Sequence, residues 1–237
     1  MIPTLTVDGL QFEVRWSDGR KTLGLTIDRE GELLISAPRG CDIALLESFV
    51  REKRFWLYTK LAEKDALREE SGKKQFVTGE GFPYLGRSYR LLVVDEDDTP
   101  LKLQRGRFRL GRQDVANGRS TFIDWYTVRA ARWLQSRAAQ LALRVGVAPS
   151  GVTVRDLGFR WGSCTNSGLL NFHWATILLP TPIVEYVVVH ELVHLREPKH
   201  TPDFWLGVER AMPDYKVRRQ RLAELGSSLT SPWGDDQ

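Results

Sequence analysis

The chain has 237 residues, of which 42% are hydrophobic and 27% are charged, the composition of a globular protein with a sizeable core. No apolar run approaches the roughly 18 residues of a membrane-spanning helix, and the first residues lack the basic and apolar regions of a signal peptide. Two widely separated cysteines, Cys41 and Cys164, argue against a disulfide scaffold. We therefore expect one large domain or two small ones in a reducing, cytoplasmic setting.

The net charge of +4 is too small for a dedicated nucleic-acid-binding protein, but it is unevenly distributed. An acidic run at residues 95–98 is followed by a basic cluster at residues 102–112, which consists of Lys102, Arg105, Arg107, Arg109 and Arg112. Such a run usually forms a solvated hairpin. The alternative is a surface that binds a nucleotide or a nucleic acid.

Residues 1–118 have the pattern of a β-rich subdomain that contains a long helix. Polar and apolar residues alternate over residues 11–16, 22–28 and 33–37, which predicts strands. From residue 42 to about 70 the apolar positions follow a helical stripe. Further strands are expected within residues 76–94 and 101–110. We place the boundary at Asn117-Gly118, because that pair is a strong turn signal before a helical pattern.

Residues 119–226 are expected to form a second, α+β core, with residues 227–237 as a frayed tail. Ser120 is a candidate N-cap for a helix that reaches about residue 145. A strand from residue 152 towards 159, a turn over 160–168 and a returning strand over 169–174 follow. Thr181 and Thr201, each before a proline, predict the starts of two more helices.

Three of the four histidines lie within residues 190–200. His190, Glu191 and His194 form an H-E-x-x-H pattern, which on a helix directs two imidazoles to one zinc ion and sets a carboxylate beside them. The residues at 187–189 are valines, which favour a strand locally. A strand would separate the two histidines by about 13 Å, so a shared metal requires a buried helix in which packing overrides propensity.

The third ligand is expected to be His200, because Pro198 stops the helix and allows the chain to turn back. The alternatives are Glu209 and Asp214, which lie further along the chain. The fourth histidine, His173, lies on the predicted strand at 169–174. It either faces the cleft or occupies an ordinary strand position.

Three blocks of the sequence resemble the YgjP-like metallopeptidase family. These blocks are Arg160–Cys164 with Leu170–Asn171, Glu185–Leu195, and His200–Trp205 with Met212–Tyr215. The resemblance spans roughly residues 10 to 225, and the chain is also similar to SprT-like proteases. It implies a zincin-like core, a small sheet with an active-site helix, in which an edge strand within residues 160–173 borders the cleft. It also implies His190, His194 and His200 as zinc ligands and Glu191 as the catalytic glutamate.

We therefore expect a zinc-dependent metallopeptidase in which Glu191 is the general base for a metal-activated water. Its partner would be a peptide or an unfolded protein, with Arg160, Asn171 and His173 as candidate substrate-binding residues. One alternative is a UTP-type nucleoside triphosphate pyrophosphatase that uses the same site, with Arg160 and the basic cluster holding phosphates. Another is a DNA-associated protease, tethered through the basic cluster at residues 102–112.

Overall fold

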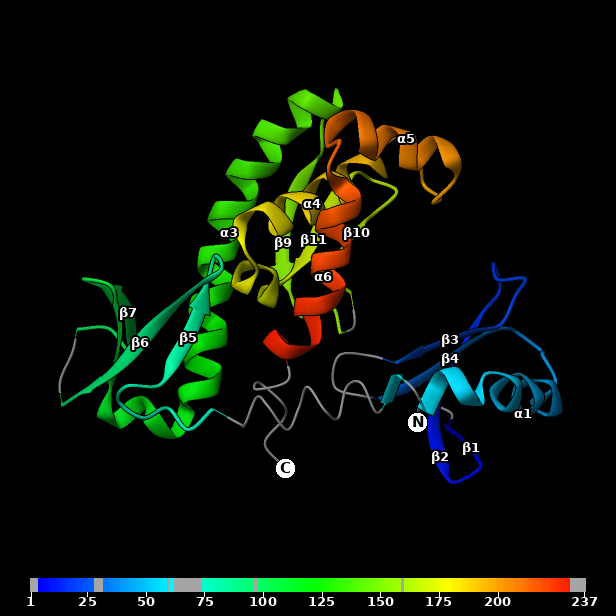
Figure 1. The fold of residues 1–237 in the computed structure, drawn as a ribbon, viewed down its shortest axis with the longest axis horizontal. Coiled ribbons are helices and arrows are strands. Elements are labelled where there is room, and N and C mark those ends of the chain that lie inside the picture. The colour runs from blue at the N-terminus through cyan, green and yellow to red at the C-terminus, as the bar shows by residue number, and fades with distance from the viewer. Residues whose placement is uncertain are drawn as a thin grey trace. The chain divides into compact units, whose positions relative to one another are not determined.

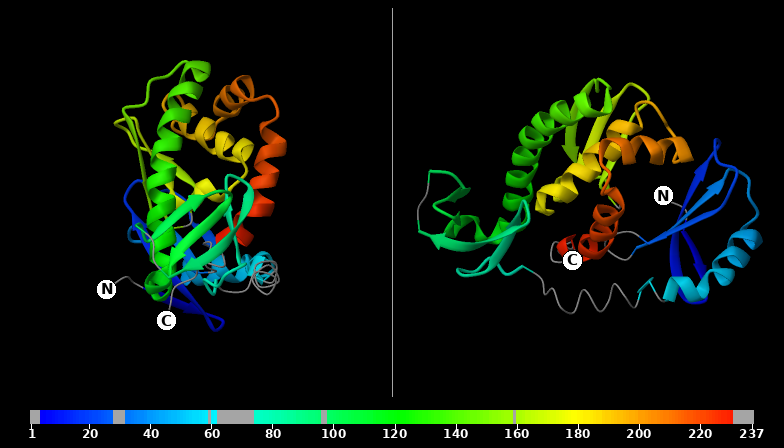
Figure 2. Two further views of the ribbon diagram at one scale, coloured as in Figure 1. Left: turned by 90° about the vertical axis from the view of Figure 1, so that its left-hand side faces the viewer. Right: turned by 45° about the horizontal axis from the view of Figure 1, so that its top comes forward.

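The computed structural model describes residues 4–27, 32–58, 60–61, 74–95, 98–158 and 160–230 (Figures 1 and 2). The fold is of the α+β class, as expected, and the chain divides into two compact units. One comprises residues 1–72 with 230–237, and the other comprises residues 73–229. In the described ranges, no helix is both long and apolar enough to cross a membrane.

The first unit is a four-stranded sheet covered by a helix. The strand order is β1 (Thr4–Val7), β2 (Leu10–Ser17), β4 (Leu33–Pro38), β3 (Gly24–Ile27), and α1 spans Ile43–Glu52. The strands predicted by alternation are present, and Phe12, Ile35 and Leu46 form part of the buried core. The predicted helix at 42–70 is interrupted at Lys53 and resumes at residues 54–58. Its remainder at 62–70 lies outside the described residues.

The second unit begins with another four-stranded sheet, which packs on a long helix. Its order is β5 (Gly81–Tyr84), β6 (Arg87–Val94), β8 (Arg107–Gly111), β7 (Leu101–Gln104), and the 3-10 helix η1 (Arg112–Asn117) leads into α3 (Gly118–Val145). Phe82 and Phe122 stack with ring centroids 4.1 Å apart. The Tyr126 hydroxyl donates to the Pro83 carbonyl at 2.8 Å.

This packing explains why the division into units differs from the boundary predicted at residue 118. The turn signal at Asn117-Gly118 is a direct passage from η1 into α3, and the sheet before it shares an aromatic core with that helix. The helix begins at Gly118, two residues before the expected cap. Ser120 instead donates its hydroxyl to the Asn117 carbonyl at 2.9 Å.

The remainder of the second unit is a three-stranded sheet with helices. Its strands are β10 (Gly162–Cys164), β11 (Leu169–His173) and β9 (Gly151–Arg155), and its helical elements are η2 (Trp174–Leu178), α4 (Thr181–Val193), α5 (Pro202–Ala211) and α6 (Tyr215–Thr230). Strand β11 is central, antiparallel to β10 and parallel to β9. The turn predicted over residues 160–168 therefore contains an edge strand, and the strand expected to reach 159 ends at residue 155.

The helix starts were predicted with mixed success. Thr201 caps α5, since its hydroxyl accepts from the Phe204 amide at 3.3 Å. Thr181 is not the cap of α4, because Pro180 occupies that position. The tail expected from residue 227 is helical as far as Thr230, and residues 231–237 lie outside the described part.

Helix α4 is buried on nearly every side. Val187, Val188 and Val189 are 3%, 0% and 0% exposed. The helix packs against α3, α5, η2 and β10, as Figure 1 shows for the yellow helix within this unit. Enclosure on all sides explains how three β-branched residues occupy a helix, because tertiary packing outweighs their local preference for a strand.

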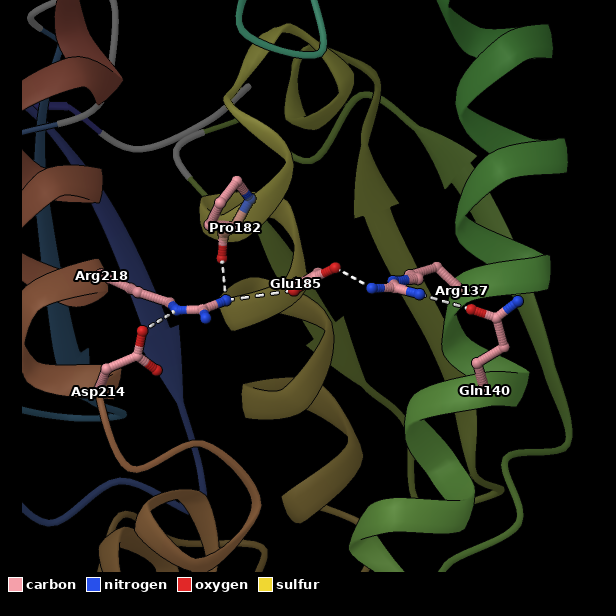
Figure 3. A network of polar contacts seen from close by, with 6 residues as sticks. All are labelled: Arg137, Gln140, Pro182, Glu185, Asp214 and Arg218. Atoms are coloured by element: carbon pink, nitrogen blue, oxygen red, sulfur yellow. Dashed lines mark hydrogen bonds and ion pairs between the residues drawn. The ribbon is translucent and has the colours of Figure 1, made fainter.

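A charged network fixes this helix to its neighbours (Figure 3). Glu185 on α4 forms ion pairs with Arg137 on α3 and with Arg218 on α6. Arg218 also donates to the Pro182 carbonyl at 2.9 Å and to Asp214 at 2.8 Å. One carboxylate therefore joins three helices.

Replacing Glu185 by Ala should destabilise the second unit, because it leaves two guanidinium groups that face each other without their shared anion. All three groups retain some contact with solvent, so we expect a loss of roughly 1–3 kcal/mol in the free energy of unfolding. Urea denaturation at neutral pH measures it. Glu224→Ala on exposed α6 is the control, expected to change stability by less than about 0.5 kcal/mol. Equal stability of the two variants would contradict the role assigned to Glu185.

Candidate metal centre

Three histidines converge at the end of α4. His190 and His194 are one helical turn apart, and the chain turns back after Val193 to bring His200 beside them. The Nε2 atoms of His190 and His200 lie 2.9 Å apart. One nitrogen from each of the three rings lies within 4.8 Å of the others, the arrangement of a potential metal site within the described residues.

The hydrogen bonding and protonation of the three imidazoles are compatible with metal binding. The Nδ1 of His194 donates to the Glu197 carbonyl at 3.0 Å, which leaves its Nε2 free to bind. Burial, and secondarily the neighbouring histidines, lowers the pKa of His190 to about 3. Burial also lowers the pKa values of His194 and His200. The neutral imidazole, which is the form that binds metals, is thus favoured in all three.

The distance between two of the imidazole nitrogens is also close to that in a tetrahedral metal site. In a tetrahedral site with metal–nitrogen distances of about 2.0–2.1 Å, ligand nitrogens lie about 3.3 Å apart. The 2.9 Å between His190 and His200 is within a few tenths of an ångström of that value. His190 and His200 could therefore hold one ion with little movement of their rings, and the nitrogen of His194 lies within 4.8 Å of both.

Glu191 lies on α4 against the edge strand β10. Its side chain is buried, and a Cβ atom added to Gly162 would lie 2.7 Å from Glu191 Oε1 and 2.7 Å from its Cγ. The absence of a side chain at Gly162 is therefore what makes room for this carboxyl group. Burial raises the pKa of Glu191 to about 8 in the metal-free protein, against the opposing effect of the Arg160 cation.

A cavity of about 730 Å³ opens over this constellation. It is bounded by β10 with the loop that follows and by the end of α4. Its lining residues are Arg160, residues 162–168, His190, Glu191, His194, Leu195, Pro198 and His200. Strand β10 pairs only with β11 within the described residues, so its other edge is unpaired, and its three residues line this cavity.

Of the three candidate substrate-binding residues, the structure brings only Arg160 to the cavity. Asn171 is 3% exposed and its Oδ1 accepts from the Thr153 hydroxyl at 2.7 Å. His173 is 5% exposed, and its Nδ1 accepts from the Ala175 amide at 3.0 Å. Both lie on the central strand β11, whose side chains are covered on either face, so they support the sheet and do not line the cavity.

The alternative third ligands are also placed elsewhere. Glu209 on α5 lies 4.0 Å from the Lys216 ammonium group. Asp214 accepts from Arg218 in the network of Figure 3. Neither carboxylate belongs to the cluster of ligand atoms formed by the three histidines.

The basic cluster lies on β7, β8 and η1 and is partly neutralised by the acidic run before it. Lys102 is paired with Asp98 at 2.6 Å, and Arg112 is paired with Asp95 at 2.7 Å. These contacts are those of a solvated hairpin, the first of the two interpretations. Binding of a nucleotide or nucleic acid there stays a prediction.

Three residues near the site were given no role from the sequence. Gly162 and Trp205 lie within blocks that carry the family resemblance, so the blocks were the signal for them. Arg219 lies on α6, and nothing in its local sequence marks it. Its cation lies close enough to His190 and His200 to lower the pKa of each.

The metal-free protein should lose stability between pH 6.5 and 8 because of Glu191. Its folded pKa of about 8 is above the ordinary 4.5, so its contribution is complete below pH 4.5 and is lost as the pH rises through about 8. Between pH 6.5 and 8 the histidines lose their remaining protons in the unfolded state, which raises stability in the wild-type protein and in a Glu191 variant alike. Measured by urea denaturation in a chelator, the Glu191 contribution relative to such a variant should fall by up to about 1.4 kcal/mol per pH unit.

The Glu191→Gln variant is the reference for this measurement, because its side chain does not titrate. Its free energy of unfolding should not fall over the same pH range, so the two curves should diverge. Parallel curves for the wild-type protein and the variant would show that Glu191 is not held in its protonated form.

Comparison with known proteins assigns the chain to a family. The family model described as the YgjP-like, metallopeptidase domain matches residues 21–225. No curated protein matches. Among solved structures, the zymogen of the metallopeptidase abylysin from Pyrococcus abyssi is 22% identical and has a TM-score of 0.37, with 39% of this chain and 95% of that chain covered. On the extent of the family match, the chain belongs to the YgjP-like metallopeptidase family.

Proposed function

We propose that the protein is a zinc-dependent endopeptidase whose ion is held by His190, His194 and His200. The observation that carries this proposal is the convergence of three imidazole nitrogens within 4.8 Å, beside a buried carboxyl group and an open cavity. Three neutral imidazoles are a donor set typical of catalytic zinc. Bound zinc would lower the pKa of a water molecule towards about 7 and polarise the scissile carbonyl.

Glu191 is the proposed general base. A cation bound by the adjacent histidines would favour the ionised carboxylate and oppose the effect of burial on its pKa. The carboxylate would then take a proton from the attacking water and deliver it to the leaving amine. Gly162 contributes by leaving space for the carboxyl group at the wall of the cavity.

The proposed substrate is an extended segment of polypeptide. The unpaired edge of β10 could bind such a segment as an additional strand, through main-chain hydrogen bonds. This mode of binding would carry a peptide bond across the cavity, past Glu191 and the histidines. Arg160, on the same wall, could bind a carbonyl or acidic group of the substrate.

Replacing Glu191 by Gln should separate metal binding from turnover. The three histidines are unchanged, so the variant should still bind one zinc ion per chain. Without its base, cleavage of an unfolded protein such as reduced casein should slow by at least about 100-fold. Zinc content by elemental analysis and fragment formation by gel and mass spectrometry measure the two effects.

The same preparations should also be incubated with a panel of nucleoside triphosphates that includes UTP. Pyrophosphate release by the wild-type protein, lost in Glu191→Gln and without any peptide cleavage, would replace the peptidase proposal with the pyrophosphatase alternative. Cleavage of the unfolded protein without pyrophosphate release is the expected result.

The Gly162→Ala variant tests the fit between Glu191 and the edge strand. The added methyl group would displace the carboxyl group, and a shift of about 1 Å in a catalytic group is enough to slow turnover about 100-fold. Zinc content should be unchanged. The matched control is Gly151→Ala on β9 of the same sheet, where the new Cβ would meet only Leu169 Cδ1 at 3.2 Å. Equal turnover in the two variants would contradict the role of Gly162.

A further inference from the structure

The third histidine of the site is held differently from the other two. His190 lies on the buried helix α4 and His194 is its C-cap, whereas His200 is exposed and lies further along the connection between α4 and α5. Fixing an exposed loop residue in one conformation has an entropic cost. A contact that orders the His200 ring before an ion arrives would therefore strengthen binding.

Trp205 on α5 supplies such a contact. Its ring is stacked on His200 with centroids 5.7 Å apart and an interplanar angle of 28°. The centroid of the same indole lies 5.9 Å from that of His190. The Trp205 ring therefore contacts the imidazoles of both His190 and His200.

Two residues of helix α6 pack against the Trp205 ring. Tyr215 stacks on the indole with centroids 5.7 Å apart at 19°, and the Arg219 guanidinium carbon lies 4.8 Å from the ring centroid. These two residues are one helical turn apart, so they present one face of α6. Arg219 forms no ion pair with any carboxylate among the described residues, which leaves its charge available to the aromatic face.

Arg218, the residue before Arg219 on α6, contacts α4, the helix that ends at His190 and His194. Arg218 forms the ion pair with Glu185 and donates to the Pro182 carbonyl, both on α4 (Figure 3). Further along, a Cβ added to Gly226 would lie 3.1 Å from the Trp161 ring, next to the edge strand β10. Helix α6 thus contacts the ligand helix, the support of the third ligand and the start of the substrate wall.

From these contacts we infer that α6 is the positioning element of the metal centre: Arg218 anchors it to α4, and Tyr215 and Arg219 hold Trp205 against His200. Trp205 and Arg219 are positioning residues that act on the ion through His200. This inference rests on the proposed function, since it takes the three histidines as the ligands. It assigns a role to a helix that carries no ligand itself.

The test is the affinity of the full-length protein for zinc, measured by competition with a chromogenic chelator. Trp205→Leu removes the aromatic surface, and loss of a group that orients a ligand weakens metal binding about 10- to 100-fold. Trp205→Phe should restore most of the affinity. Arg219→Gln also removes a positive charge that repels a bound cation, so its affinity is compared with that of the wild-type protein in about 1 M salt, where this repulsion is screened. There the loss of the cation–π contact should weaken binding about two- to five-fold.

A matched control is available on α3. Arg129 lies over Trp125 with 5.2 Å between its guanidinium carbon and the ring centroid, a similar pair outside the site. Arg129→Gln should leave zinc affinity unchanged. The absorption spectrum of the cobalt-substituted protein is a second readout. It is expected to change in Trp205→Leu and Arg219→Gln but not in Arg129→Gln, because only the first two changes loosen the stacking that orients the His200 ring.

The outcomes distinguish the inference from the proposed function. If the wild-type protein binds zinc but Trp205→Leu and Arg219→Gln bind it equally tightly with unaltered cobalt spectra, the inference is overturned and the metal site stands. A loss confined to Trp205→Leu also overturns the role of α6. If the wild-type protein itself binds no zinc, both fail. Should Trp205→Leu not fold, Arg219→Gln decides the question alone.

Discussion

The burial of α4 is the constraint on which the rest of the site depends. A helix that is apolar on nearly all sides is stable in water only when other elements enclose it. Here α3, α5, η2 and β10 do so and leave one polar edge, His190, Glu191 and His194, facing the cavity. The same burial raises the pKa of Glu191 and lowers that of His190. Enclosure therefore stabilises the helix and keeps the His190 imidazole in the neutral form that binds metals.

A second consequence of this enclosure is the closeness of the edge strand to the helix. Strand β10 approaches α4 so nearly that Gly162 has no space for a side chain. The strand that is available to pair with an extended substrate is therefore in direct contact with Glu191. Recognition of the main chain and proton transfer would both take place at this short strand, which couples the position of a substrate to that of the carboxylate.

The sequence predicted those features that local periodicity or spacing records. Alternation identified β2, β3 and β4, helical spacing paired His190 with His194, and Pro198 indicated the return of the chain to His200. Gly-Ser-Cys in β10 carries no alternation, so the edge strand within residues 160–173 was expected from the family resemblance alone. Helix α6 was not predicted, because its sequence is largely polar and its contacts depend on tertiary neighbours. Asn171 and His173, two candidate substrate-binding residues, lie on a central strand covered on both faces, which no pattern within that strand reveals.

The three histidines of the candidate metal centre are oriented by three different physical means. His194 is held by a hydrogen bond to the Glu197 carbonyl, and His200 by stacking on Trp205. The Nδ1 of His190 is buried without a hydrogen-bond partner among the described residues, and its ring is confined by Tyr186, Phe204 and Trp205. The side of the ring that carries Nδ1 is therefore oriented by packing and not by a hydrogen bond. The aromatic residues around it therefore position a ligand as directly as a hydrogen bond does elsewhere, and Trp205 does so for two of the three.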